Sequence, residues 1–508
     1  MLNGQKIRVF APICTADAPA RPKLKNTKQF NGVCGCDWCL HAGVQVIRGK
    51  GFARAYPFNA EQKERTHSEM EMYAVKALET RIPQYGVKGP STLSKLSHFD
   101  LVDGFVPDFL HCALLGVARQ LVSLWFDTSN HDRPWYIGQP CTLAKYDARV
   151  KNVVVPKEVR RLRRSIQARE HWKANEFKTF VLYYSLVVLQ GILPSRFLSH
   201  FFLFVWSLHK LLGTSITHQD LVKVKAALDL FIIQMEELYG VGSCTFNVHQ
   251  LSHLAKSTRM CGPLWAVSTF TFESNNGILK KMIQGTQYVS EQVCQTYAIM
   301  KTLPVLMKQC VNSNENVSQV LHKLVSGKKE TQRAVRLAEN LVALSKAKIR
   351  DLSEEERLTM ALAGEVVNKV VYEYNRFTWE QKLYDTEQYR RSDKRKNCFI
   401  KAVIQGKELY CKIKALVTVK KCNCEIQHHE DCHCRKHNVL TCMPLKVVND
   451  RSFKYDNFRI TSGFLLEVLE FTHSVILVQL NQIVTKCVKV KQSDKVYLIE
   501  MPNMVEVE

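Results

Sequence analysis

The sequence has few acidic residues and no long uninterrupted hydrophobic run. Asp and Glu together number 47 against 71 Lys and Arg, which gives a formal net charge of +24. An excess of this size favours a polyanionic partner, because each phosphate that a protein neutralises releases condensed counterions. Ribosomal and membrane-surface proteins are also basic, so charge alone selects no mechanism.

No stretch of the sequence resembles a membrane span. The most apolar segment, residues 177–212, is interrupted by five residues that do not suit a lipid environment, which are Gln190, Gly191, Pro194, Arg196 and His200. Neither half therefore supplies the roughly 20 apolar residues that a span requires. The segment predicts two buried helices of a soluble domain, and no membrane partner is expected. The first residues also form too short an apolar run for a secretory signal.

Cysteine, in contrast, is abundant. The chain has 18 cysteines, and without a secretory signal they indicate a reducing compartment, where Cys fills cores or binds metals. Internal repeats and low-complexity segments are lacking. An apolar content of 46% over 508 residues predicts a folded protein of two to four domains.

Periodicity gives a coarse map of the chain. Helical spacing, alternation and turn residues predict a strand at 6–14 that ends at Asp17, helices at 60–80, 106–125, 290–345 and 353–375, almost continuous helix from 155 to 262, and alternating strands from 397. The first helix of the 155–262 region, KEVRRLRRSIQARE, is expected to have a basic face. The basic tract RRSDKRK (390–396) is expected to be an exposed linker.

Three segments together resemble transposases of the CACTA (En/Spm) superfamily, whose catalytic domain is RNase H-like. CTADAPARPKLKNTKQFNGVCGCDWCLHAG (14–43) resembles the segment with the second catalytic Asp and a Cys-x2-Cys pair. Residues 87–121 resemble the D-x2-H block, here Asp108 to His111, and residues 247–286 resemble the block with the final Glu, here Glu273. The three occur in the family's order.

The resemblance implies an α+β fold. We expect a partial RNase H-like core interrupted by an all-helical insertion and followed by helices and a small β-rich C-terminal module. The corresponding domains are a core with a Cys-x2-Cys knuckle (1–130), the helical insertion (131–262), a closing catalytic-type helix with a helical linker (263–390) and the β-rich module (391–508).

The resemblance also implies catalytic roles. Asp17 and Glu273 correspond to the second and third carboxylates of a two-metal Mg²⁺ site that cleaves and transfers DNA strands. Alternatively, Asp17 is a surface turn residue and Glu273 merely suits a helix start. The family's first Asp is missing, since none of the sixteen residues before Asp17 is acidic. We therefore expect strands one to three of the RNase H sheet to be absent and the chain to be inactive as a transposase.

A second set of residues suggests a structural metal. Cys36 and Cys39 form a knuckle, and His249 and His253 lie one helical turn apart, a two-plus-two set that suits tetrahedral Zn²⁺. The arrangement resembles the zinc site of the V(D)J recombinase catalytic subunit and implies that the metal joins the insertion to the core. Alternatively, the cysteines pack as small hydrophobes and the histidines cap a buried helix. Asp108 and His111 are alternative candidates for metal ligands, or for residues that support the ligands.

Further Cys and His residues lie in the β-rich part. These residues could form a zinc site, or they could lie in a long hairpin loop that binds metal only adventitiously, and the loop is favoured. They are Cys422, Cys424, His428, His429, Cys432, Cys434 and His437.

DNA contacts are expected from the basic helix. A concentrated patch able to meet phosphates would consist of Arg160, Arg161, Arg163 and Arg164. A solvated helix face is the alternative.

The leading hypothesis is a transposase-derived protein that binds the DNA backbone with low sequence selectivity and does not cut it. An active transposase whose N-terminal part is missing from this chain is one alternative, and a non-enzymatic interaction scaffold is another. A second copy of the chain is a candidate partner, and the family resemblance with the basic tracts suggests the nucleus.

Overall fold

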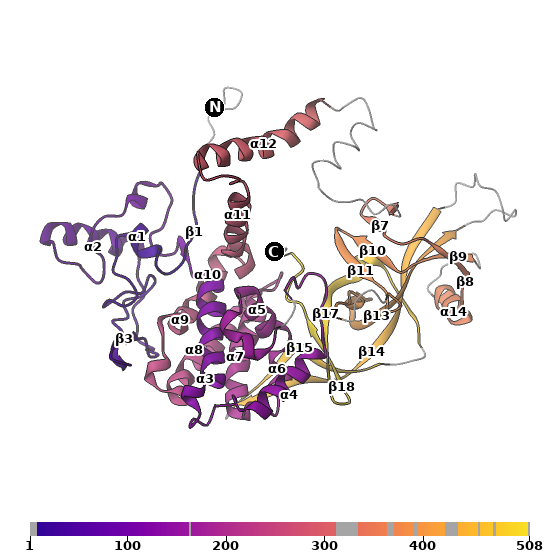
Figure 1. Cartoon of the computed structure of the whole chain (residues 1–508), viewed down its shortest axis with the longest axis horizontal. Coiled ribbons are helices and arrows are strands. Elements are labelled where there is room, and N and C mark those ends of the chain that lie inside the picture. The colour runs from indigo at the N-terminus through magenta and orange to yellow at the C-terminus, as the bar shows by residue number, and fades with distance from the viewer. Residues whose placement is uncertain are drawn as a thin grey trace.

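The computed structural model describes residues 8–161, 164–310, 334–362, 370–389, 394–421, 435–455, 458–470 and 474–505. The fold is mixed α+β, as expected. Figure 1 shows a small N-terminal lobe, a central helical body and a β-rich C-terminal module, with two successive helices standing out from the top of the body.

The N-terminal lobe contains two small sheets. A parallel pair is formed by β1 (Cys14–Thr15) and β4 (Phe105–Val106), and an antiparallel hairpin by β2 (Val44–Arg48) and β3 (Gly51–Ala55). Its helices are α1 (Arg21–Lys25), α2 (His67–Thr80) and the 3₁₀ turn η1 (Thr92–Lys95).

Two expectations for this lobe can be compared with the structure. The strand predicted at 6–14 is only the two-residue β1, and residues 8–13 form no regular element. The polar helix is present as α2 and begins at His67, because the Thr66 hydroxyl accepts a hydrogen bond from the Glu69 backbone N–H and caps it. Within the described residues the lobe has no sheet larger than two strands, so an RNase H-like core remains a prediction.

The helical body is built largely of short helices around two long ones. Its elements are η2 (Leu110–Ala118), α3 (Arg119–Phe126), η3 (Thr128–Asn130), α4 (Pro140–Lys151), η4 (Ile166–His171), α5 (Ala174–Thr179), η5 (Phe180–Tyr184), α6 (Ser185–Val188), α7 (Ser195–Leu211), α8 (His218–Tyr239), η6 (Val241–Ser243), α9 (Phe246–Gln250), η7 (Leu251–His253), α10 (Leu254–Cys261) and η8 (Leu264–Val267).

The most apolar segment forms the centre of this body. It divides at the turn that contains Gly191, which has φ +64°, and continues as α7 after Pro194. Helix α7 is buried along nearly its whole length, which explains why its sequence is apolar on every side. Among the described residues, no helix is both long and apolar enough to cross a membrane.

The predicted basic helix at 157–170 is wrong. After the short strand β5 (Val153–Val154) the described residues 155–161 and 164–165 form no helix, and only the end of the predicted helix is helical, as the 3₁₀ turn η4. Strand β5 pairs with β17 of the C-terminal module, and the Lys157 N–H donates to the Asn397 side chain over 2.7 Å. These tertiary contacts hold the segment in a turn and irregular backbone and override its local helix propensity.

The C-terminal module is a β-barrel-like structure. Its strands are β8 (Lys348–Asp351), β9 (Val370–Tyr374), β12 (Phe399–Ile404), β13 (Lys407–Lys421), β14 (Arg435–Tyr455), β15 (Phe458–Glu470), β16 (Ile476–Val478), β17 (Ile483–Gln492) and β18 (Lys495–Glu500), with the 3₁₀ turn η9 (Leu480–Gln482). The order β14-β15-β18-β17-β12-β13 closes through a β13–β14 pairing. Residues 422–434, with all but His437 of the second Cys and His cluster, lie outside the described residues.

Strands begin well before the expected boundary at 391. A four-stranded sheet consists of β6 (Val335–Ala338), β7 (Leu341–Ala343), β10 (Arg376–Trp379) and β11 (Lys382–Asp385). Among the described residues, the helices predicted at 290–345 and 353–375 are present as α12 (Val289–Cys310) and α14 (Glu354–Leu362), whereas 335–338, 341–343 and 370–374 are strands; residues 311–333 and 363–369 lie outside the described residues. The β10–β11 turn consists of Glu380 and Gln381, both with positive φ, and it lacks the Gly or Asn that identifies such hairpins in a sequence.

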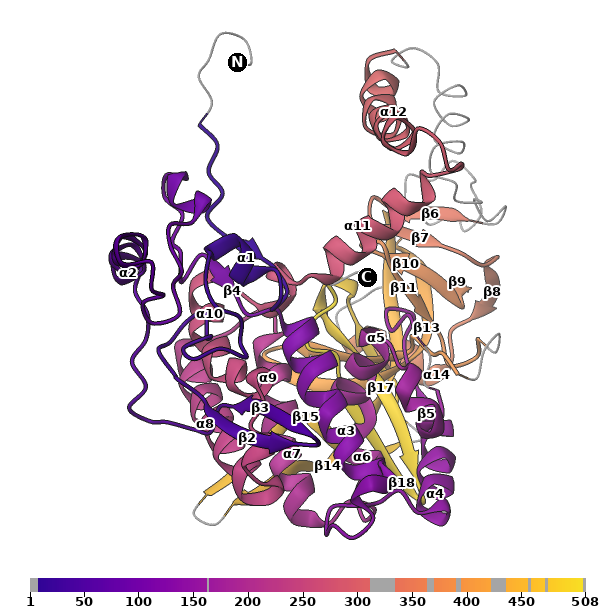
Figure 2. The same ribbon diagram turned by 60° about the vertical axis from the view of Figure 1, so that its left-hand side comes forward.

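One hydrophobic core joins the helical body to the barrel. His209 of α7 stacks on Phe464 of β15 with ring centres 3.8 Å apart, and its Nε2–H donates to the Glu500 carbonyl over 2.9 Å. Burial lowers the pKa of His209 to about 4, so the ring is neutral at this junction. In the view of Figure 2, helices α11 (Phe270–Lys281) and α12 stand above the joined body.

Candidate metal centre and carboxylate cluster

Cys36, Cys39, His249 and His253 converge at one buried point. Their ligand atoms all lie within 4.8 Å of one another. Cys36 Sγ lies 3.4 Å from His253 Nε2, Cys39 Sγ lies 3.3 Å from His249 Nε2, and the two Nε2 atoms are 3.4 Å apart. The predicted two-plus-two set is thus assembled from segments more than 200 residues apart in the sequence.

These spacings suit a tetrahedral metal such as zinc. Bonds of about 2.3 Å to sulfur and about 2.0–2.1 Å to nitrogen place a sulfur and a nitrogen about 3.6 Å apart, and two nitrogens about 3.3 Å apart. The observed separations are within a few tenths of an ångström of both values. Four buried soft and borderline ligands in this arrangement could therefore hold one metal ion.

The protonation of the cluster also favours a cation. Burial alone raises the pKa of the Cys36 thiol, but a hydrogen bond with Cys39 and the nearby His253 and His249 rings bring it well below its usual range. The same hydrogen bond raises the pKa of Cys39. Burial lowers the pKa of His249, so its ring is neutral, as a metal ligand must be. The lowered pKa of Cys36 suits a thiolate ligand, and a bound metal would displace the thiol proton of Cys39.

Neighbouring groups hold the ligands in place. The Trp38 backbone N–H donates to Cys36 Sγ over 3.5 Å, and the Arg65 guanidinium donates to the Cys36 and Cys39 carbonyls over 2.9 and 3.1 Å. The Tyr56 ring stacks on His249 at 5.1 Å. These contacts orient the ligands as supporting groups do in protein metal sites.

A buried ionic network connects the Cys36–Cys39 knuckle to α1 and to α9. Asp37, inside the knuckle, accepts from Arg21 Nε over 2.7 Å, and Arg21 also donates to the Gln250 side chain over 2.7 Å. Lys25 Nζ lies 3.4 Å from Asp37. Residue types alone did not identify Arg21, Asp37, Gln250 or Arg65 as part of the site, because these contacts are set by tertiary packing and leave no periodic pattern in the sequence.

Two of the carboxylates in the transposase-like segments, Asp17 and Asp108, follow two neighbouring parallel strands. Asp17 comes two residues after β1, and Asp108 comes two residues after β4, with which β1 pairs. The carboxyl ends of parallel neighbours meet at the same sheet edge, so the two acids lie on the same side. The Thr15 hydroxyl donates to the Val267 carbonyl over 3.1 Å and holds this edge against the segment that leads into α11.

His111 is the meeting point of these acids. Its Nδ1 pairs with Asp108 Oδ2, and its Nε2 lies 3.6 Å from Glu273 Oε1 on α11. The hydrogen bond with Asp108 raises the pKa of His111 against its partial burial, and the charges of Asp108, Glu273 and Asp17 raise it further. Asp17, Asp108, His111 and Glu273 are thus brought together from three separate parts of the chain.

This cluster is not arranged as a Mg²⁺ site. Asp108 is 1% exposed, and its oxygens are occupied by His111, by the Thr269 hydroxyl at 2.8 Å and by the Leu110 N–H at 3.1 Å. Among the described residues, only the Cys36 group places three or more potential ligand atoms close enough for one ion. Asp108 orients His111, and Thr269 is a supporting residue that the sequence did not reveal.

The predicted arginine patch is divided by the structure. Arg164 forms an ion pair with Glu176, and Arg161 lies 3.9 Å from the same carboxylate. Arg160 lines a pocket with Lys178. Arg163 lies outside the described residues. The three described arginines therefore do not form one continuous face.

The chain matches no protein-family model, and neither the curated proteins nor the solved structures contain a significant match.

Proposed function

We propose that this chain derives from a DDE-type transposase of the CACTA (En/Spm) superfamily and binds DNA through the phosphate backbone in the nucleus. The observation that carries the proposal is the convergence on His111 of Asp108, Glu273 and Asp17. The three acids occur in the order of the family's blocks. The net charge of +24 supplies the attraction for a polyanion.

DNA binding without strand cleavage fits the cluster best. Asp17 and Glu273 would be the remaining carboxylates of the ancestral Mg²⁺ site, while Asp108 is committed to orienting His111. Two-metal phosphoryl transfer needs carboxylates that share the ions. An active transposase would therefore require a further carboxylate beside Asp17 and Glu273.

We further propose Zn²⁺ as the metal of the Cys36, Cys39, His249 and His253 site. Two thiolates and two imidazoles form a closed ligand set, which is typical of structural zinc. Bound there, zinc would supply folding free energy and fix the N-terminal lobe to the helical body. The cluster around His111 lies between these two parts, since His111 follows β4 and Glu273 lies on α11.

The salt dependence of DNA binding tests the proposed function. Fluorescence anisotropy of the full chain with short labelled duplexes of unrelated sequence would be measured between about 50 and 200 mM salt. We expect similar affinities for all sequences and a linear fall of log K with log salt, with a slope of about −0.9 for each phosphate contacted. Absence of binding at the lowest salt, or an affinity independent of salt, would refute the proposal.

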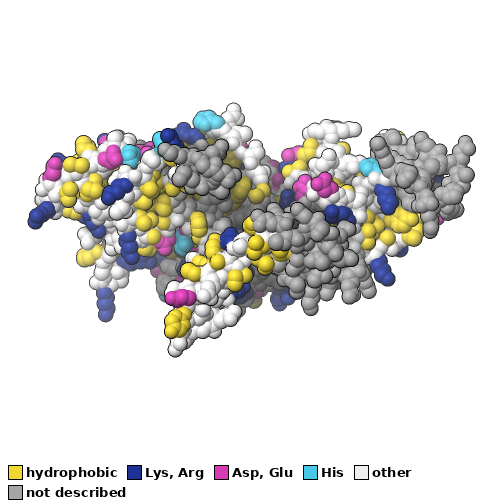
Figure 3. Space-filling model, turned by 90° about the horizontal axis from the view of Figure 1, so that it is seen from above, with side chains coloured by type: hydrophobic (Ala, Val, Ile, Leu, Met, Phe, Trp, Pro, Cys, Tyr) yellow, Lys and Arg dark blue, Asp and Glu magenta, His cyan; other side chains and the backbone are white. Residues whose placement is uncertain are grey.

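A second candidate function is protein interaction, which α12 favours. Seen from above in Figure 3, this projecting helix bears hydrophobic side chains, and Ile299 is 64% and Val305 53% exposed. A second copy of the chain is the partner we would test, by light scattering of the unchanged chain, of Ile299→Glu and of the polar control Gln295→Glu. A dimer lost only in Ile299→Glu would support this function, and a monomer in all three would exclude it.

A further inference from the structure

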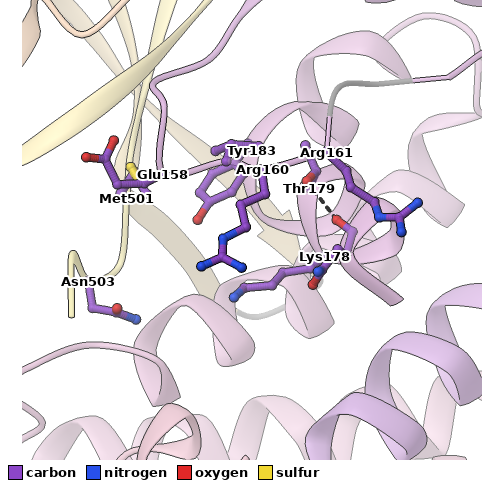
Figure 4. Close-up of a pocket in the computed structure, with 10 residues that line it drawn as sticks. Glu158, Arg160, Arg161, Lys178, Thr179, Tyr183, Met501 and Asn503 are labelled. Carbon is purple, nitrogen blue, oxygen red and sulfur yellow. Dashed lines mark hydrogen bonds between the residues drawn. The ribbon is translucent and has the colours of Figure 1, made fainter. Parts of the chain in front are cut away.

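A pocket lies at the junction of the helical body and the end of the C-terminal module. It encloses about 390 Å³, part of it open solvent, and its walls come from the 158–161 segment, from α5 and η5, and from the chain after β18. Its polar and charged lining includes Glu158, Arg160, Arg161, Lys178, Thr179 and Asn503 (Figure 4).

The positive charge of the pocket is concentrated in two side chains. Figure 4 shows Arg160 and Lys178 extending toward the same part of the pocket, whereas Arg161 is turned away. Arg161 faces Glu176, and the Glu158 carboxylate is paired with Lys486 over 2.5 Å. In the part of the chain that the structure describes, no carboxylate lies within ion-pair distance of Arg160.

The segment that bears Arg160 is held firmly. Arg395 donates to the Arg160 carbonyl over 2.6 Å and to the Lys157 carbonyl over 3.1 Å. Lys486 anchors Glu158 two residues earlier. The backbone beneath Arg160 is thus ordered before any ligand arrives, so binding need not order the backbone at this point.

The pocket lies beside the carboxylate cluster. The Lys178 ammonium is 5.1 Å from the ring centre of Phe270, the first residue of α11. Phe270 in turn lies 5.8 Å from Phe109, which is adjacent to Asp108. Both rings are buried, with Phe270 7% and Phe109 1% exposed, so the pocket and the cluster are connected through the protein core.

We propose that Arg160 and Lys178 bind one backbone phosphate of a DNA strand at this pocket. This inference rests on the proposed DNA binding and adds the position at which the strand is held. Cations scattered singly over a surface, as on the face seen in Figure 3, attract DNA without placing it. Two converging cations on an ordered backbone fix the register of a strand.

The test compares three variants of the full chain. Arg160→Ala removes the charge, Arg160→Lys retains it, and Lys223→Ala removes a matched exposed charge from α8, which does not line the pocket. For Arg160→Ala we expect the slope of log K against log salt to become shallower by about 0.9. At about 0.1 M salt that change equals a roughly tenfold loss of affinity for duplex DNA. Arg160→Lys and Lys223→Ala should retain most of the slope.

The outcomes separate the two proposals. If the unchanged chain binds DNA but Arg160→Ala has the same slope and affinity, the pocket assignment fails and DNA binding stands. If the unchanged chain does not bind DNA, both fail. Polyglutamate at equal charge concentration is the competitor: if it displaces DNA from the unchanged chain but not from Arg160→Ala, the pocket accepts acidic peptides and the nucleic-acid assignment is overturned.

Discussion

Replacement of Lys486 by Met would test whether the helical body and the barrel depend on one buried charge. The Lys486 side chain is fully buried on β17, and its ammonium lies 2.5 Å from Glu158 Oε1 and 2.5 Å from the Leu383 carbonyl. It also lies 4.3 Å from the ring centre of Tyr384. Glu158 is only 15% exposed, and its second oxygen has no hydrogen-bond partner among the described residues.

The cost of the substitution comes from the charge left behind. Without Lys486, the Glu158 carboxylate stays in a largely dehydrated site without a counterion, and breaking a buried pair in this way costs about 3–5 kcal/mol. Removing both charges with Lys486→Met and Glu158→Gln leaves no uncompensated ion. The free energy of unfolding lost by the double variant should therefore be smaller than the sum of the losses of the two single variants.

Urea denaturation followed by circular dichroism would measure these losses. Lys495→Met is the control, because the Lys495 side chain that pairs with Glu467 over 2.7 Å is itself 59% exposed, unlike the fully buried Lys486, and ion pairs at the surface contribute at most about 1 kcal/mol. Lys486→Met should also weaken DNA binding, because the 158–161 segment loses its anchor. Additive losses, or a Lys486→Met variant as stable as Lys495→Met, would refute this reasoning.

Two further predictions concern the region around His111 and its packing. The pKa of His111 should lie above its usual value of 6.5, and Asp108→Asn should lower it, as measured by NMR titration of the imidazole. Because the pKa of His111 is raised in the folded state, the stability that its protonated ring contributes is complete below about pH 6.5 and is lost as the pH rises through the raised pKa. A pKa of His111 that is unchanged in Asp108→Asn would contradict the pairing. In Gly116→Ala, the added Cβ would lie 2.6 Å from the Asn247 side chain, and we expect a loss of about 1–3 kcal/mol in thermal or urea unfolding. A midpoint equal to that of the unchanged chain would show that η2 and α9 are not so closely packed.

Local patterns predicted the parts of the site whose spacing is short. The Cys36 and Cys39 knuckle and the His249 and His253 pair are each contained within five residues, so each could be recognised separately. Their meeting in space was implied by a resemblance and is present in the structure. The ion pair of Arg21 with Asp37 could not be predicted, because buried charges are specified by tertiary packing and not by periodicity.

In the fold, too, the elements set by local sequence were predicted and those set by tertiary contacts were not. Helix α7 was predicted because the long apolar run begins directly after Gly191 and Pro194, two residues that commonly precede a helix, and a run of this length is typical of a buried helix. The helix predicted at 157–170 is absent from 157–161 because β5 pairs with β17 and the following residues are tied to the C-terminal module in a turn. The hairpin at Glu380 and Gln381 was missed because its turn contains none of the residues that usually indicate positive φ.

The metal content of the purified full chain tests the central claim most directly. Elemental analysis should find one zinc per chain, and X-ray absorption should show two sulfur and two nitrogen ligands at about 2.3 and about 2.0–2.1 Å. Cys39→Ser should lose the metal and unfold at lower temperature, whereas Cys141→Ser, at an exposed cysteine, should retain both metal and stability. A folded, metal-free chain whose melting temperature is the same with and without added zinc would contradict the account.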